Sequence, residues 1–304
     1  MLTKGMAKRT SKAPATRPKP PVEVVDPRWL LRAGAGVLLA AILCAYFSLW
    51  LLFWQGQWQF ALHPSHTVAN TPTSLNLPFE PVHFGVDAGG TPQLSGWFIP
   101  CDSPAAPTAL ILHSGDGNIA DALPTAQLLH TARLNVLLFD YRGYGASAGE
   151  HPAEAQMQID ANTALIYLAS TRHIPTATII PVGLGVGASL ATDLAAQNRD
   201  IPAIILDSPS GDIDSAVEHD PRTRFVPVRL LLHEHFALIS PLGALATPKL
   251  ILTRTTSPYD ARSVANPKMT VELKPNDDVA YVQALTRFTD QYLTHVIPSL
   301  TPKP

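Results

Sequence analysis

The sequence predicts an α/β fold with a doubly wound, mostly parallel sheet, preceded by one N-terminal transmembrane helix. Three observations predict it. Short apolar runs, typical of strands buried on both faces, alternate with helical patterns beyond residue 80. A glycine-dense turn at residues 183–187 joins one such run to an Ala-rich helix. Residues 33–54 form 22 consecutive positions without a charge.

The uncharged run is long enough for a membrane span. At 1.5 Å per residue, a helix over residues 33–54 crosses a hydrocarbon core of about 30 Å. Trp50, Trp54 and Trp58 follow at its far end, where amphipathic rings favour the headgroup layer. A cleaved signal peptide is the alternative, but the basic region and the apolar segment are both too long for one, and no convincing cleavage site follows. We therefore expect an uncleaved single-pass anchor.

The charges before the span indicate its orientation. The chain has 22 basic and 24 acidic residues, and eight of the basic ones lie in residues 1–32, against two acidic residues there. Because basic flanks stay inside, we expect a cytoplasmic N-terminus and an extracytoplasmic C-terminal domain, in the inner membrane of a bacterium. Residues 1–32 are expected to be a disordered tail, 55–80 a connector, and 81–304 the folded domain.

The elements of the domain follow in order. An antiparallel pair is expected at 81–86 and 93–99, because a Gly-containing turn joins them. The continuous apolar runs predict buried strands, and the stretches between them predict helices. The expected strands are 108–113, 135–140, 178–184, 203–207, 249–253 and 269–273; the expected helices are 120–132, 153–170, 188–197 and 279–296. Residues 208–246 are expected to be irregular.

Several motifs resemble one known superfamily. The turn Gly183-Leu184-Gly185-Val186-Gly187 has the frame of the G-x-S-x-G nucleophile elbow. Residues 94–100, 112–119 and 207–209 add to the similarity, as does Asp140-Tyr-Arg-Gly-Tyr-Gly-Ala-Ser147, and Asp140 and Arg142 are expected to hold this last loop in place. The chain resembles the α/β-hydrolase superfamily over residues 60–296, in particular the membrane-anchored, serine-aminopeptidase-like branch that includes the fungal bud-emergence proteins. The resemblance implies an α/β-hydrolase fold.

The same resemblance implies a catalytic triad whose positions are degenerate here. The family has its nucleophilic Ser at the elbow centre, which is Gly185 in this chain. Its acid follows the penultimate strand, where Ser257 stands and Asp260 lies three residues further on. Its His follows the last strand, where Pro275 or Asn276 takes the place. A serine hydrolase needs all three roles, so the sequence predicts that this chemistry is lost.

The loop that binds the oxyanion in the family is retained more fully in this chain than the triad. His113, Ser114 and Gly115 open into a helix, and Val186 follows the elbow centre. Backbone N–H groups at such positions bind anions and oxyanions. We therefore expect these four residues to bind a ligand, which can be a small molecule, a lipid or a partner protein.

Two hypotheses remain open. The first is a pseudoenzyme that binds a ligand or partner in the former catalytic cleft. The second is an active ester or amide hydrolase with a non-standard nucleophile such as Ser208, although a helix cap is the expected role of that residue. Ser189, four positions past Gly185, is expected to point into the helix packing.

No motif indicates a cofactor or nucleic acid. Gly183-x-Gly-x-Gly is too short for a dinucleotide fingerprint, and the pair His233 and His235 would need distant partners to hold a metal. Cys44 lies in the span and Cys101 in the domain, so no disulfide is expected within the domain.

Overall fold

The computed structural model describes residues 26–103, 106–254 and 263–293. Two compact units divide the chain between Leu49 and Trp50. Helix α1, Pro27–Gly56, continues into the 3-10 turn η1, Gln57–Phe60. In the described part of the chain, this helical stretch alone has the length and apolarity needed to cross a membrane. The predicted span is helical. Of the tail expected over residues 1–32, residues 1–25 lie outside the described residues, and the expectation of disorder is wrong for residues 27–32, which are the first turns of α1.

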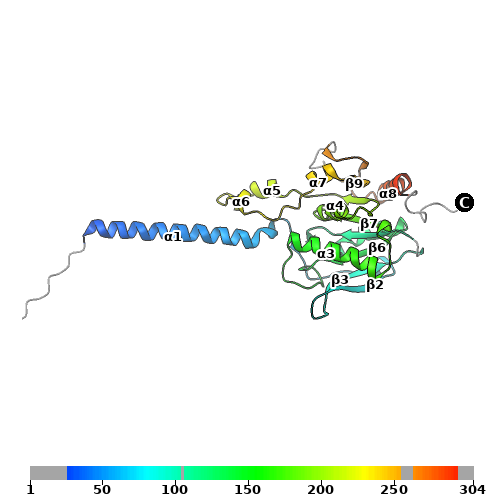
Figure 1. Ribbon diagram of the computed structural model, residues 1–304, viewed down its shortest axis with the longest axis horizontal. Helices are drawn as coiled ribbons and strands as arrows, with labels where there is room; N and C mark the ends of the chain where they lie inside the picture. The colour runs from blue at the N-terminus through cyan, green and yellow to red at the C-terminus, as the bar shows by residue number, and fades with distance from the viewer. Residues whose placement is uncertain (1–25, 104–105, 255–262, 294–304) are drawn as a thin grey trace, which may run out of the picture. The chain divides into compact units, whose positions relative to one another are not determined.

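From Trp50 onward the described residues build an eight-stranded sheet with helices on both faces, and a separate two-stranded sheet (Figure 1). The strand order is β10-β9-β8-β7-β4-β6-β3-β2, and all neighbours are parallel except for β2 with β3 and β3 with β6. The predicted doubly wound, mostly parallel sheet is confirmed. The strands are β2 Glu80–Val86, β3 Pro92–Ile99, β4 Thr108–Leu112, β6 Asn135–Asp140, β7 Ile179–Leu184, β8 Ile204–Asp207, β9 Lys249–Thr253 and β10 Lys268–Glu272.

Alternate residues of each buried strand feed two separate cores. Leu110 and Leu112 of β4 face the core under α3, α4 and α7, whereas Ile111 faces the core under α2 and α8. Since side chains alternate across a strand, a strand buried on both faces reads as a continuous apolar run. The helices are α2 Leu123–Thr131, α3 Glu154–Ile166, α4 Gly187–Gln197, α5 Asp214–Glu218, α6 Val228–Leu231, α7 Ile239–Ala244 and α8 Asp278–Tyr292.

Short turns complete the unit. The 3-10 turns are η2 Pro72–Leu75, η3 Ile119–Ala122, η5 Thr176–Thr178 and η6 Pro221–Thr223, and a π-helical turn, η4 Tyr167–Thr171, ends α3. Residues 208–246, expected to be irregular, contain α5, η6, α6 and α7. These helices are four to six residues long, which is too short for a periodic pattern to reveal them.

The expected connector also has structure. A two-residue strand, β1 His63–Pro64, pairs in parallel with β5 Asp116–Gly117. Leu62 and Leu77 are buried in the two cores of the domain. The residues after α1 therefore pack on the domain, and they lie directly against the loop that follows β4.

Candidate functional site

The turn between β7 and α4 has the geometry of a nucleophile elbow. Gly185 adopts a left-handed conformation with φ of +55°. A Cβ at Gly183 would lie 2.5 Å from Ala188 Cα, and one at Gly187 would lie 2.7 Å from the His113 carbonyl oxygen and closer still to that of Leu112. Both glycines thus permit the close approach of helix to strand. The predicted elbow frame is present, and its central residue has no side chain.

The apex of this turn lies beside serine residues from two other loops. A Cβ at Gly185 would lie 3.1 Å from Ser114 Cβ and 3.5 Å from Ser210 Oγ. The Gly185 carbonyl accepts a bond of 3.0 Å from the Ser210 backbone N–H, which ties the loop after β8 to the elbow. Val186 begins the turn into α4 and is buried. Ser114, Gly185 and Val186 are therefore close together, as the sequence predicts. Ser210 also lies at this site, and residue spacing in the sequence does not predict it.

The buried side chain of His113 packs beneath the loop that follows β4. Its ring is buried and contacts the rings of Tyr141 and Tyr144, with centroids 4.4 and 4.9 Å away. Its Nδ1 lies 2.7 Å from the Ser114 carbonyl oxygen, and its buried Nε2 has no hydrogen-bond partner among the described residues. Burial lowers the pKa of His113 to about 4, so the imidazole is neutral at physiological pH. The ring holds the backbone of the predicted binding loop in position.

Gly115 is covered by the chain that follows α1. Its carbonyl accepts hydrogen bonds from the His63 N–H at 2.7 Å and from the Tyr144 hydroxyl at 2.9 Å. The carbonyl oxygen of Ala61 lies on its other side, where a Cβ would collide with it. The binding loop is thus fixed by residues close in sequence to the apolar helix. No local pattern predicts this contact.

Ser208 lies at the carboxyl end of β8, at the same edge of the sheet. Its Oγ–H donates to Asp207 Oδ1 at 3.0 Å, and Arg254 Nη1 donates to Ser208 Oγ at 3.0 Å. Arg254 also forms an ion pair with the buried Asp207 carboxylate through both terminal nitrogens. The expected cap role is wrong, because the next helix, α5, begins only at Asp214. In the described residues no histidine is within hydrogen-bond distance of Ser208 Oγ.

Among the described residues, the triad position in the turn after β10 gives no catalytic group. Asn276 has φ of +58° in the turn between β10 and α8, and its neighbour Asp277 caps α8 by accepting the Ala280 N–H at 3.0 Å. Ser257 and Asp260 lie outside the described residues. Ser189 is buried and donates to the Val186 carbonyl at 2.8 Å, so its hydroxyl is part of the helix packing.

Asp140 and Arg142 hold the loop after β6 through separate partners. The buried Asp140 carboxylate accepts the N–H groups of Ile119 and Ala146, and burial raises its pKa to about 6. Arg142 donates from Nε to the buried Asp160 at 2.7 Å, and its backbone N–H donates to the same carboxylate. The expectation that these two residues fix the loop agrees with these bonds, and Asp160 is the partner that sequence reasoning missed.

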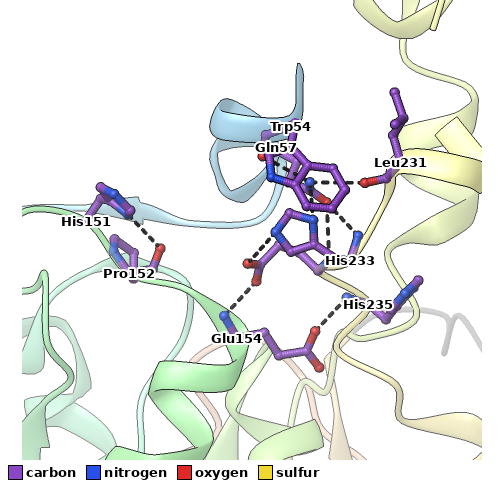
Figure 2. A network of polar contacts seen from close by, with 9 residues as sticks. Trp54, Gln57, His151, Pro152, Glu154, Leu231, His233 and His235 are labelled. Atoms are coloured by element: carbon purple, nitrogen blue, oxygen red, sulfur yellow. Dashed lines mark hydrogen bonds and ion pairs between the residues drawn. The ribbon is translucent and has the colours of Figure 1, made fainter. Parts of the chain in front are cut away.

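A second polar cluster joins the end of α1 to the domain (Figure 2). The buried side chain of Gln57 donates to His233 Nδ1 at 2.5 Å and to the Leu231 carbonyl at 3.3 Å, and it accepts the His233 N–H at 2.7 Å. The Trp54 ring lies 4.6 Å from the ring of His233. Sequence reasoning missed Gln57, because Gln55, Gln57 and Gln59 all follow the apolar run and no local signal distinguishes Gln57 from the other two.

The cluster continues to the start of α3. The Glu154 N–H donates to Glu234 Oε2 and the His235 N–H donates to Glu154 Oε2, each at 2.6 Å (Figure 2). Burial raises the pKa of Glu234. Histidine and carboxylate groups are close here, but no group of three or more in the described residues has the arrangement of a metal site. The side chains instead fasten segment 231–235 to two helices.

Comparisons with known proteins agree with this fold. No family model matches the chain. Protein bem46 of Schizosaccharomyces pombe is 35% identical over 141 residues, 45% of this chain and 46% of that protein. The α/β-hydrolase domain-containing protein WAV2 of Arabidopsis thaliana is 33% identical over 141 residues. An uncharacterized protein of Mycobacterium tuberculosis is 33% identical over 162 residues, 53% of this chain and 56% of that protein. The chain thus spans about half the length of the curated relatives it matches.

Solved structures show the same architecture. An esterase of Pyrococcus furiosus matches with a TM-score of 0.60 at 17% identity, over 77% of this chain and 98% of its own. An α/β hydrolase of Vibrio vulnificus matches with a TM-score of 0.57 at 22% identity, over 77% of this chain and 88% of its own. At these identities the likeness establishes the fold. With the strand order and the elbow, it shows that the chain has the α/β-hydrolase fold, and about half of the chain is similar in sequence to bem46 and WAV2.

Proposed function

We propose that this protein is a membrane-anchored α/β-hydrolase-fold pseudoenzyme that binds a ligand or a partner protein at the elbow. The observation that carries the proposal is Gly185, which keeps the strained elbow conformation without a nucleophilic side chain. A serine hydrolase splits the reaction into two steps by forming a covalent acyl intermediate, and that intermediate is attached to a side-chain oxygen at this position. Without one, the surrounding donors can bind a substrate-like group but cannot form the intermediate.

The groups around the apex favour a ligand with acceptor oxygens. Ser114 and Ser210 surround the apex, and the first turn of α4 follows it with the positive end of its dipole. Arg254 adds a guanidinium at the same edge of the sheet. An ester, amide or carboxylate group of a small molecule, a lipid or a protein segment fits such donors. No metal or cofactor is required for binding of this kind.

The apolar helix supports membrane anchoring. The exposed large apolar side chains of α1 continue up to Trp54, as a lipid-facing helix requires. With basic residues on its N-terminal side, the proposed orientation leaves the N-terminus in the cytoplasm and the domain outside it, in a bacterial inner membrane. A reporter active only in the cytoplasm, fused after Pro304, should be silent; strong activity would overturn the orientation.

One observation favours a second candidate, an active hydrolase that uses Ser208. This residue has φ of +47°, and strained non-glycine residues cluster at functional sites. However, its hydroxyl donates to a carboxylate that is already paired with Arg254, and no histidine of the described residues is close enough to take its proton. The pseudoenzyme therefore agrees better with the geometry.

Fluorophosphonate labelling of the full chain in detergent tests the choice between the two. The probe reacts with activated serine nucleophiles, and an esterase of the same fold provides the positive control. We expect no labelling above that of heat-denatured protein, and no rapid turnover of short-chain esters. Labelling that is lost in Ser208→Ala but kept in Ser210→Ala would establish the second candidate.

A further inference from the structure

Exposed apolar side chains lie on the segment between β8 and α7. We define the cap surface as Phe225 and Leu230 with the neighbouring Arg222, Arg224 and Arg229. Phe225 and Leu230 are 70% and 72% exposed, which is high for large apolar side chains in a segment that also has a buried side. Their neighbours Val217 and Val228 point inward and are buried. The segment is thus amphipathic, and its apolar outer side has no partner within the described residues.

The inner side of this segment packs directly on the end of the apolar helix. Phe53 of α1 is only 7% exposed because it packs with Val217 and Val228. Phe60 joins the same cluster, with its ring 5.8 Å from that of Phe53 and 4.4 Å below the guanidinium of Arg222. These contacts lie within the compact unit that begins at Trp50.

Polar contacts fix the same junction from a second side. Gln57 bonds to the backbone at Leu231 and His233, directly after Leu230. Leu230 is therefore one residue from a position that is attached to the end of the helix. Phe225 is three residues from Val228, which touches Phe53. Both exposed side chains thus lie within a few residues of direct contact with the last apolar turn.

If residues 33–54 span the bilayer, this turn lies at its surface. The span of 22 residues covers about 33 Å, slightly more than a hydrocarbon core of about 30 Å. Phe53 and Trp54 are then at the level of the headgroups, together with the segment packed on them. The inference made here rests on that proposed anchoring.

We propose that the cap surface docks on the outer leaflet beside the anchor, with Phe225 and Leu230 inserted at the boundary of headgroups and acyl chains. Aromatic and aliphatic side chains flanked by arginines are the composition of interfacial membrane surfaces. Arg222 and Arg229 pair with Asp220 and Glu218, and the guanidinium of Arg224 lies 5.7 Å from the Phe225 ring.

A cleft on this surface agrees with the proposal. It has a volume of about 470 Å³ and is lined by Glu218, Arg224, Arg229 and Leu230 among others, with Glu218 paired to Arg229. Basic and apolar groups side by side match a lipid, whose phosphate and acyl chain are adjacent. Docking would hold the domain against the bilayer at a second point, separate from the helix.

The experiment uses the full chain in vesicles of phosphatidylethanolamine and phosphatidylglycerol. Cys44 and Cys101 are replaced by Ser, and single cysteines at Phe225 or Leu230 carry an environment-sensitive fluorophore. Leu52→Cys, within the helix, is the positive control. Val279→Cys, an exposed apolar position on α8, is the matched negative control. A second set of vesicles contains lipid with a nitroxide near the head of the acyl chain.

We expect the nitroxide to quench the fluorophore at 225 and 230 nearly as strongly as at 52, and to leave 279 unchanged. Quenching at 52 alone would overturn the proposed docking of the cap surface and would support the proposed membrane anchor. No quenching at any position would mean that the anchoring itself is wrong. Protection at 225 that depends on the protein-to-lipid ratio, without quenching, would also overturn the proposal, because it would indicate a second copy of the chain on this surface. Thermal melts confirm that each labelled variant is folded.

Discussion

Substituting Gly187 by Ala tests the closeness of α4 to β4, which defines the elbow. The added Cβ would meet the carbonyl oxygens of Leu112 and His113, which belong to the backbone and cannot rotate away. Ordinary contacts begin near 3.4 Å, and the His113 oxygen would be at 2.7 Å, so strand and helix must separate by at least about 0.7 Å. Overpacking of this kind costs about 2–3 kcal/mol.

The assay is thermal unfolding of the full chain in detergent, followed by circular dichroism. In a domain of this size each kcal/mol shifts Tm by about 2–4 °C, so Gly187→Ala should lower Tm by about 4–12 °C. Gly56→Ala is the control, because no atom lies within 4 Å of its added Cβ. Its Tm should stay the same or rise slightly. A Tm of Gly187→Ala equal to that of the control would refute the close packing.

Three further predictions concern the supports of the site. Burial lowers the pKa of His113 in the folded protein to about 4, below its value of 6.5 in the unfolded chain. The stability that neutral His113 contributes to the folded state is therefore present above pH 6.5 and is lost as pH falls towards 4. The unfolding free energy of the wild type should therefore fall by up to about 3 kcal/mol relative to His113→Asn over this range, measured by urea titration; parallel pH profiles would contradict it. Arg142→Ala leaves the buried Asp160 carboxylate without its cation and should cost about 3 kcal/mol in the same titration at pH 7, whereas a loss below about 1 kcal/mol would show that water replaces the guanidinium. Gln57→Ala removes the bonds to the segment after α6 and should speed its cleavage by trypsin, while the exposed Gln55→Ala should cleave as the wild type does; equal rates would show that apolar packing alone holds the segment.

The parallel sheet could be predicted because its signals are local. Residues 136–139 and 250–252 are continuous apolar runs with polar residues at both ends, and β6 and β9 extend over each run and the polar residue on either side of it. The elbow is partly local, since Gly183 is required by the close approach of Ala188 and Gly185 by its positive φ, whereas Gly187 is required by the backbone of Leu112 and His113 on a distant segment. Strands and turns of this kind are set by a few adjacent residues, so a single sequence is enough to predict them.

Contacts between distant segments could not be predicted in the same way. Gln57 and His233 are 176 residues apart, and nothing near either residue indicates the other. The pairing of Asp207 with Arg254 depends on the register of β8 and β9, in which Asp207 lies beside Leu252. Before that register is known, Ser208 is equally compatible with a helix cap. The roles of the polar residues in this chain thus follow from strand register and from long-range packing.

The central claim, that the elbow carries out no acyl chemistry, can be tested by intact-protein mass spectrometry. The full chain is mixed with an activated acetate ester, and the reaction is stopped with acid within seconds. The mass of the intact protein is then measured, with an esterase of the same fold as the positive control. Because Gly185 has no side-chain oxygen and no histidine of the described residues lies within hydrogen-bond distance of Ser208 Oγ, we predict an unmodified mass at every time point. An acetyl adduct that forms in one-to-one ratio, turns over, and is abolished by Ser208→Ala would contradict the account.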